Sequence, residues 1–130
     1  MKNLISFLVI ASILLMTCYG CKNSNDQSVI GVWKYSRSFE NGIEYELDSC
    51  EKQDQFEFLV DGTFTEKYYY LDESNKCALD GKNTGSWRKK EKDTFLIDYD
   101  GEVFKIVLQK KTFYLKYEDE VIKKEIYTKQ

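Results

Sequence analysis

From Gly31 onward, apolar and polar residues alternate along the chain, and a period of two predicts β-strands. Aromatic and β-branched residues are frequent, and no proline occurs that would interrupt a hydrogen-bonded ladder. No segment after residue 21 has a convincing helical period. The expected strands are residues 32–39, 43–47 (a weak pattern), 55–60, 63–70, 85–90, 94–99, 102–108, 112–117 and 121–128.

Short turns join these strands in hairpin succession. Asn41-Gly42, Asp61-Gly62 and Asp100-Gly101 are sequences that suit two-residue hairpins with positive φ, and Lys110-Lys111 is a further tight turn. The longest stretch without a strand pattern is residues 71–83. Eight or nine strands in this order, each with one apolar face, predict an all-β fold. We expect an eight-stranded up-and-down antiparallel barrel, because closure removes the free sheet edges.

The inner face of such a barrel carries bulky side chains here, which is as consistent with a filled interior as with a ligand cavity. Trp33 and Trp87 can line that cavity or cap a barrel end, with the indole N–H bonded to backbone. Expected inward residues are Phe56, Phe58, Phe64, Tyr68, Phe95, Ile97, Phe104, Ile106, Phe113 and Leu115, with Ile122 and Ile126 in the last strand. The candidates to line a ligand site are Trp33, Phe56, Phe58, Phe64, Tyr68, Trp87, Phe95, Phe104 and Phe113. We expect no carboxylate among the aromatic faces.

The first 21 residues have the order of a secretory leader: a short basic start, an apolar run and small residues before a cysteine. The apolar run is too short for a comfortable membrane span. We expect cleavage before Cys21 and acylation on it, because Gly20 is small and a polar stretch follows; Cys18 is the alternative. Residues 22–28 then form a flexible tether to a domain of residues 29–128. An ordinary leader that releases a soluble protein is the other interpretation.

Cys50 and Cys77 remain in the expected domain, and export would place them where paired thiols oxidise. The alternatives are two free thiols or a zinc site, but two isolated cysteines without histidine make a poor zinc site. The chain has no histidine at all, which excludes Ser–His and Cys–His nucleophilic catalysis. We therefore expect no enzyme activity, no metal and no cofactor.

The charge of the chain is mildly acidic. The net charge is −3, and removal of Lys2 with the leader makes it one unit more negative. Such a charge does not favour nucleic-acid binding.

A set of short motifs follows in a fixed order along the chain. They are Gly31-Val32-Trp33, Cys50 with Gln53-Asp54, the Asp61-Gly62-Thr63 hairpin, Cys77, and Gly85-Ser86-Trp87. The first is similar to the G-x-W opening of lipocalins, and the whole order resembles that of the lipocalin-like domain lipoproteins of Gram-negative bacteria, from about Val29 to Tyr127. The resemblance implies an eight-stranded barrel and a Cys50–Cys77 disulfide, but little chemistry, since most members have no known function.

These expectations combine into a binding module rather than a catalyst. The leading hypothesis is a monomeric lipoprotein of the cell envelope, anchored to a membrane (the outer membrane is favoured), with a small apolar or amphipathic ligand at the open barrel end. The alternative is an envelope protein–protein interaction module with a filled barrel, which contacts its partner through the outer face or residues 71–83. A cavity of a few hundred Å³ would favour the first. An exposed apolar patch over a packed interior would favour the second.

Overall fold

The computed structural model describes residues 28–118 and 122–130, so the expected leader, both candidate acylation sites (Cys18 and Cys21) and all but the last residue of the tether lie outside the described residues. In these ranges the chain is all-β except for one short 3-10 helix, η1 (Glu51–Gln53). The strands are β1 (Gly31–Glu40), β2 (Ile43–Tyr45), β3 (Gln55–Phe58), β4 (Thr63–Leu71), β5 (Cys77–Glu91), β6 (Thr94–Tyr99), β7 (Glu102–Gln109), β8 (Thr112–Glu118) and β9 (Ile122–Lys129).

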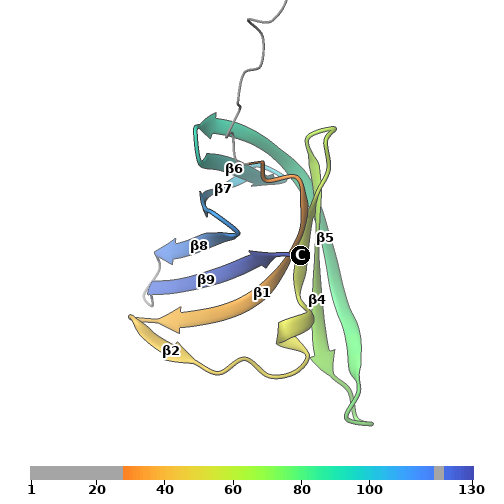
Figure 1. Cartoon of the computed structure of the whole chain (residues 1–130). Coiled ribbons are helices and arrows are strands. Elements are labelled where there is room, and N and C mark those ends of the chain that lie inside the picture. Colours follow the sequence, from red (N-terminus) through yellow and green to blue (C-terminus); the bar gives the residue numbers. More distant parts are fainter. Residues whose placement is uncertain (1–27, 119–121) are drawn as a thin grey trace, which may run out of the picture.

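Eight of the strands close into an antiparallel barrel, which confirms the expected fold class. β3 to β9 pair in chain order, and β9 returns to pair with β1 along nearly its whole length. The short β2 lies outside this ring as a hairpin on the last residues of β1. Figure 1 shows the curved wall, with β4 and β5 forming a long hairpin that extends beyond the neighbouring strands.

β1 changes partner halfway along one edge. Its residues 31–34 pair with β3, whereas residues 38–40 pair with β2. The segment from β2 through η1 runs between these two pairings and lies close to β4 (Figure 1). Leu47 in this segment is buried and belongs to the main hydrophobic core. Residues 46–54 are therefore part of the barrel wall rather than a free loop.

The turns follow the expected chemistry with one exception. Asn41-Gly42 and Asp100-Gly101 each have positive φ at both residues, as two-residue hairpins of this type require. Lys110-Lys111 is also a two-residue turn, with Lys110 in the left-handed region. At Asp61-Gly62 only the glycine has positive φ, and the hairpin is wider, because β3 already ends at Phe58. Asp61 instead accepts hydrogen bonds from the backbone and hydroxyl of Thr63.

Two expectations about the strands were also wrong. Residues 77–83 are not a loop: they are the start of β5 and pair with β4 after a turn at residues 72–76. In β9 the inward phase is the opposite of the expected one, since Glu125 and Tyr127 are buried while Ile122 is 48% exposed and Ile126 is not in the core. A shift of one residue moves every side chain of a strand to the other face, so this error changes the chemistry of the interior.

The two ends of the barrel differ in burial. We call the end where β1 begins and β9 ends the closed end, and the opposite end, where several aromatic rings are only partly buried, the open end. At the closed end, Val29 is buried and Trp33 donates its indole N–H to the Val29 carbonyl at 2.7 Å. Trp87 lies at the same end and donates to the Leu59 carbonyl at 2.9 Å. The Lys129 ammonium lies 5.3 Å from the centre of the Trp33 ring. Apolar side chains thus plug the end at which the domain begins.

Gly85 lies where β5 passes directly under the ring of Phe64. A Cβ at this position would be 2.6 Å from the Phe64 ring and would also collide with the Asp98 carbonyl oxygen. We expect Gly85→Ala to lower the free energy of unfolding by about 3 kcal/mol, because neither backbone nor packed ring can yield cheaply. Gly81→Ala is the matched control in the same strand, since its Cβ would meet only Tyr68, at 3.8 Å. Urea denaturation of both variants measures the difference, and equal stabilities would contradict this account.

Candidate ligand-binding site at the open end of the barrel

In the part of the chain that the structure describes, two buried carboxyl groups lie at the open end of the barrel, where β1 ends and β9 begins. Glu66 of β4 is 4% exposed and Glu125 of β9 is 9% exposed, and both lie on the inner face. This corrects the expectation that no carboxylate lies among the aromatic faces. Buried carboxyl groups are rare unless they are paired, so their partners decide what this end can do.

Glu66 is held by neutral donors. The Tyr99 hydroxyl donates a 2.7 Å hydrogen bond to Oε2 of Glu66, and Tyr68 and Asn83 also lie within interaction range. Asn83 in turn donates to the Tyr68 hydroxyl at 3.0 Å. Burial raises the pKa of Glu66, the hydrogen bonds partly oppose this, and the nearby charge of Glu125 adds to the increase.

Glu125 forms an ion pair with a lysine of the same strand. The ammonium of Lys123 lies 2.7 Å from Oε1 of Glu125, and the Tyr127 hydroxyl donates to Oε2 at 3.1 Å. Burial alone would lower the pKa of Lys123, but the hydrogen bond and charge of Glu125 outweigh it and the pKa is raised. Tyr45 also contributes a hydrogen bond that favours the charged ammonium.

Aromatic rings form an arc around these carboxyl groups. Phe64, Tyr99, Phe104 and Tyr117 contact one another in succession, with ring centres 4.9, 5.7 and 5.6 Å apart. They come from β4, β6, β7 and β8, so the arc spans about half of the barrel wall. Tyr99, Phe104 and Tyr117 are only partly buried, in contrast to the rings deeper in the core. We call Tyr99, Phe104 and Tyr117 the ring arc.

Ser38 is the buried polar group beside Glu125. It is directly opposite Glu125 in the β1–β9 pairing and is fully buried. Burial raises the pKa of the Tyr35 phenol, and the nearby Ser38 hydroxyl opposes this only in part. Even so, Ser38 Oγ makes no hydrogen bond of acceptable distance and angle with any described residue. A buried hydroxyl without a good hydrogen bond is unfavourable in a packed interior, so Ser38 is a polar exception among the inward-facing side chains of β1.

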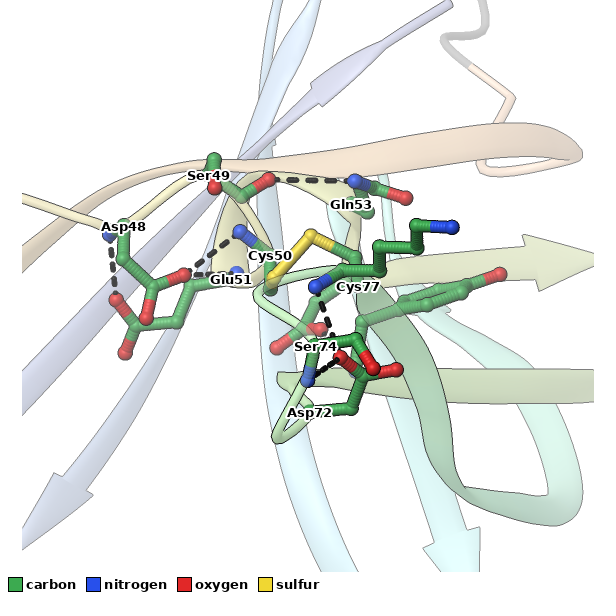
Figure 2. Close-up of a disulfide and its surroundings, with 11 residues drawn as sticks. Asp48, Ser49, Cys50, Glu51, Gln53, Asp72, Ser74 and Cys77 are labelled. Atoms are coloured by element: carbon green, nitrogen blue, oxygen red, sulfur yellow. Dashed lines mark hydrogen bonds between the residues drawn. A yellow bond between two sulfur atoms is a disulfide. The ribbon is translucent and has the colours of Figure 1, made fainter.

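A disulfide crosslinks the barrel wall beside the open end. Cys50, which follows β2, and Cys77, the first residue of β5, form a disulfide with a Cα–Cα distance of 5.2 Å, as expected (Figure 2). Asp48 accepts the backbone N–H groups of Cys50 and Glu51, while Glu51 accepts that of Asp48, a reciprocal cap on η1. On the other side Asp72 accepts the N–H groups of Ser74 and Lys76 in the β4–β5 turn.

Asp54, just before β3, adds hydrogen bonds to the same part of the wall. Its Oδ1 accepts the backbone N–H of Tyr69 at 2.7 Å, and its carbonyl accepts that of Tyr35 at 2.9 Å. Burial raises the pKa of Asp54 to about 6, and the Tyr69 hydrogen bond opposes this. The residue thus links β1, β3 and β4 where direct pairing between β1 and β3 has ended.

The residues expected to line a ligand site divide into two groups. Tyr68 and Phe104 lie at the open end, close to Glu66 and the ring arc. The others lie in the core or at the closed end, where they pack against one another. These are Trp33, Phe56, Phe58, Phe64, Trp87, Phe95 and Phe113.

Sequence reasoning missed the polar members of the site. Glu66 has the same period-two phase as Phe64 and Tyr68, so its inward position was readable from the alternation. The inward position of Glu125 and Lys123 was not readable in this way. The alternating set of β9 residues that contains the isoleucines is the more apolar one, so it was expected to face inward. Only the register of β9 against β1 and β8 turns the charged phase inward.

A depression lies on the outer wall, over β1, β8 and β9. It has a volume of about 400 Å³ and combines basic and apolar side chains. Arg37 within it is already paired with Glu44 at 2.7 Å. We call this depression the outer groove; it is lined by Arg37, Phe39, Gly42, Lys116, Ile122, Lys124 and Ile126.

The sequence model of the lipocalin-like domain matches residues 29–116. The chain belongs to this family. The lipocalin-like match ends within β8, so the structure alone places Lys123, Glu125 and Tyr127 of β9 in the barrel. No curated protein and no solved structure matches the chain significantly.

Within residues 28–118 and 122–130, no helix is long and apolar enough to span a membrane. The same part of the chain contains no group of three or more acidic, cysteine or histidine side chains placed to share a metal ion.

Proposed function

We propose that the protein is a membrane-anchored binding module that holds a small apolar or amphipathic ligand at the open end of its barrel and performs no catalysis. The observation that carries this proposal is the ring arc, whose partly exposed aromatic faces surround polar groups at one end of a core that is otherwise filled. Binding sites of this kind combine apolar walls with a few oriented polar groups. Membership of the lipocalin-like family supports the binding role.

The proposed anchor is an acyl group on Cys21, with Cys18 as the alternative, in the cell envelope and on the outer membrane in particular. The leader pattern and Gly20 support it. Ser28 and Val29 enter the barrel at the closed end, and a seven-residue tether of residues 22–28 reaches at most about 25 Å. An anchored domain would therefore be tethered at its closed end, which leaves the open end free to take its ligand from the aqueous phase.

Native mass spectrometry of the protein purified from its own membranes tests this proposal. We expect an acylated N-terminal Cys21 and a stoichiometric small molecule that is released on denaturation. An unmodified mature N-terminus would refute the anchor, and an empty protein would refute the carrier role. A neutral apolar fluorophore, N-phenyl-1-naphthylamine, provides the second readout, since an intact open end should enhance its fluorescence.

The alternative function is a protein–protein interaction module of the envelope. The outer groove supports it, because a partly apolar, basic surface depression suits an acidic partner segment better than a lipid. Crosslinking in the intact envelope separates the two proposals. A partner captured by a photoreactive residue at position 39, on the outer wall, together with an empty barrel would favour the interaction module.

A further inference from the structure

Among the described residues, two buried carboxyl groups lie at the open end, and only one of them has a cation beside it. Glu125 is paired with the Lys123 ammonium at 2.7 Å, and Tyr45 contacts the same ammonium. The open end therefore already holds one ammonium group between a carboxylate and a tyrosine. This internal arrangement is a precedent for an ammonium group at this end of the barrel.

Glu66 has a similar environment without the cation. Its described partners are the hydroxyls of Tyr99 and Tyr68 and the amide of Asn83, all of them neutral. No ion pair between the described residues includes Glu66. A buried carboxylate is costly unless a positive charge compensates it, so this half of the site is electrostatically incomplete.

The surroundings of Glu66 suit an organic cation rather than a bare metal ion. Tyr99 of the ring arc contacts Phe64 and Phe104 edge to face, which leaves partly exposed aromatic surface beside the carboxyl group. Aromatic faces attract ammonium groups, most strongly where water is excluded. The unpartnered hydroxyl of Ser38, opposite Glu125, is a further hydrogen-bonding group at the same end.

We infer that the Glu66 side of the open end binds the ammonium group of a small organic amine, with the ring arc in contact with its apolar body. This inference rests on the proposed function and specifies the ligand class. An anionic ligand would meet two carboxyl groups, and a neutral apolar ligand would leave Glu66 buried without a counter-charge. A cationic amphipathic amine satisfies both the charge and the rings.

The affinity for an amine should increase with pH across the acidic range. Burial raises the pKa of Glu66, and only its deprotonated form pairs with an ammonium ion. Protons are therefore released on binding, and affinity falls as the pH falls below that pKa. Among the described residues, the groups that interact with Glu66 or its neighbours come from every strand around this end. They are Tyr35 of β1, Tyr45 of β2, Glu51 of η1, Asp54 before β3, Tyr68 of β4, Asn83 of β5, Tyr99 of β6, Glu102 of β7, Tyr117 of β8, and Lys123, Glu125 and Tyr127 of β9.

Calorimetric titration with three ligands of similar shape tests the inference: 2-phenylethylammonium, 2-phenylethanol and 3-phenylpropanoate. We expect the amine to bind at least ten-fold more tightly than the alcohol and the carboxylate not to bind. Glu66→Gln preserves the hydrogen-bond acceptor but not the charge, so it should remove this ten-fold preference and leave the alcohol unaffected. Glu57→Gln on β3 is the matched control, because Glu57 has the outward phase between buried Phe56 and Phe58.

The outcomes separate the ligand class from the proposed function. Enhanced N-phenyl-1-naphthylamine fluorescence without any preference for the amine would overturn the ligand class and leave the binding role intact. Amine binding that survives Glu66→Gln would overturn the assignment to Glu66. Failure of every ligand and of the fluorophore would refute both proposals. Circular dichroism of each variant establishes that the barrel is folded.

Discussion

Phe56→Ala is expected to lower the free energy of unfolding by about 3–5 kcal/mol, the range for removal of a fully buried aromatic side chain. Phe56 has no exposed surface and lies at the centre of the aromatic core. Its ring centre is 5.0 Å from that of Tyr127 and 5.6–5.8 Å from those of Phe58, Phe64 and Phe113. These rings come from β3, β4, β8 and β9, so the cavity would loosen opposite walls together.

Urea denaturation followed by far-ultraviolet circular dichroism measures this loss. Because domains of this size are stable by only about 5–15 kcal/mol, the variant should be close to unfolding at 37 °C. Phe39→Ala is the control on the outer wall, where Phe39 is only half-buried and stacks against Arg37. It should cost about 1 kcal/mol or less. A similar loss for both variants would mean that the barrel interior is not the main core.

Removal of the Cys50–Cys77 disulfide should have the second large effect. The bridge closes a separation of 27 residues, for which chain entropy predicts about 3–4 kcal/mol of stabilisation. Cys50 is also fully buried, so the double variant Cys50→Ala/Cys77→Ala loses packing as well. Residues 46–54 fill the gap where β1 leaves β3, and we expect them to loosen first.

The double variant is compared with the wild type by thermal unfolding with and without a reducing agent. Reduction should destabilise the wild type to about the level of the variant and leave the variant unchanged. Asp48→Ala is the matched control, because it removes the η1 cap but keeps the bridge, and it should cost about 1 kcal/mol. If Asp48→Ala alone destabilised the protein as much as the double variant does, local hydrogen bonds rather than the disulfide would be the main stabilisation of residues 46–54.

The sequence allowed the barrel to be predicted because its signals are local. Asn41-Gly42 and Asp100-Gly101 specify their own turns, and the phase of Phe56 and Phe58 identifies an inner face without any partner strand. The start of β5 had no such signal. Cys-Ala-Leu-Asp-Gly-Lys-Asn does not alternate, and it becomes a strand because β4 pairs with it and Cys50 bridges to its first residue.

The candidate site was less predictable than the fold, because its inward side chains are charged and the fold was predicted from apolar alternation. Apolar alternation identifies the inner face only where the interior is apolar. In β9 the isoleucines face outward and Lys123, Glu125 and Tyr127 face inward, since pairing with β1 and β8 fixes the register. A register set by partners distant in sequence cannot be read from a single strand.

The pairing of β1 with β9 also constrains the order of folding. Trp33 is opposite Lys129 and Glu40 is opposite Lys123, so the seam joins residues separated by most of the domain. Local hairpins can form early, but the seam requires closure of the longest loop in the barrel, which favours slow folding. Until β9 has docked, the edges of β1 and β8 remain open to other chains. The folding chain is therefore prone to aggregation until β9, the last strand, has paired.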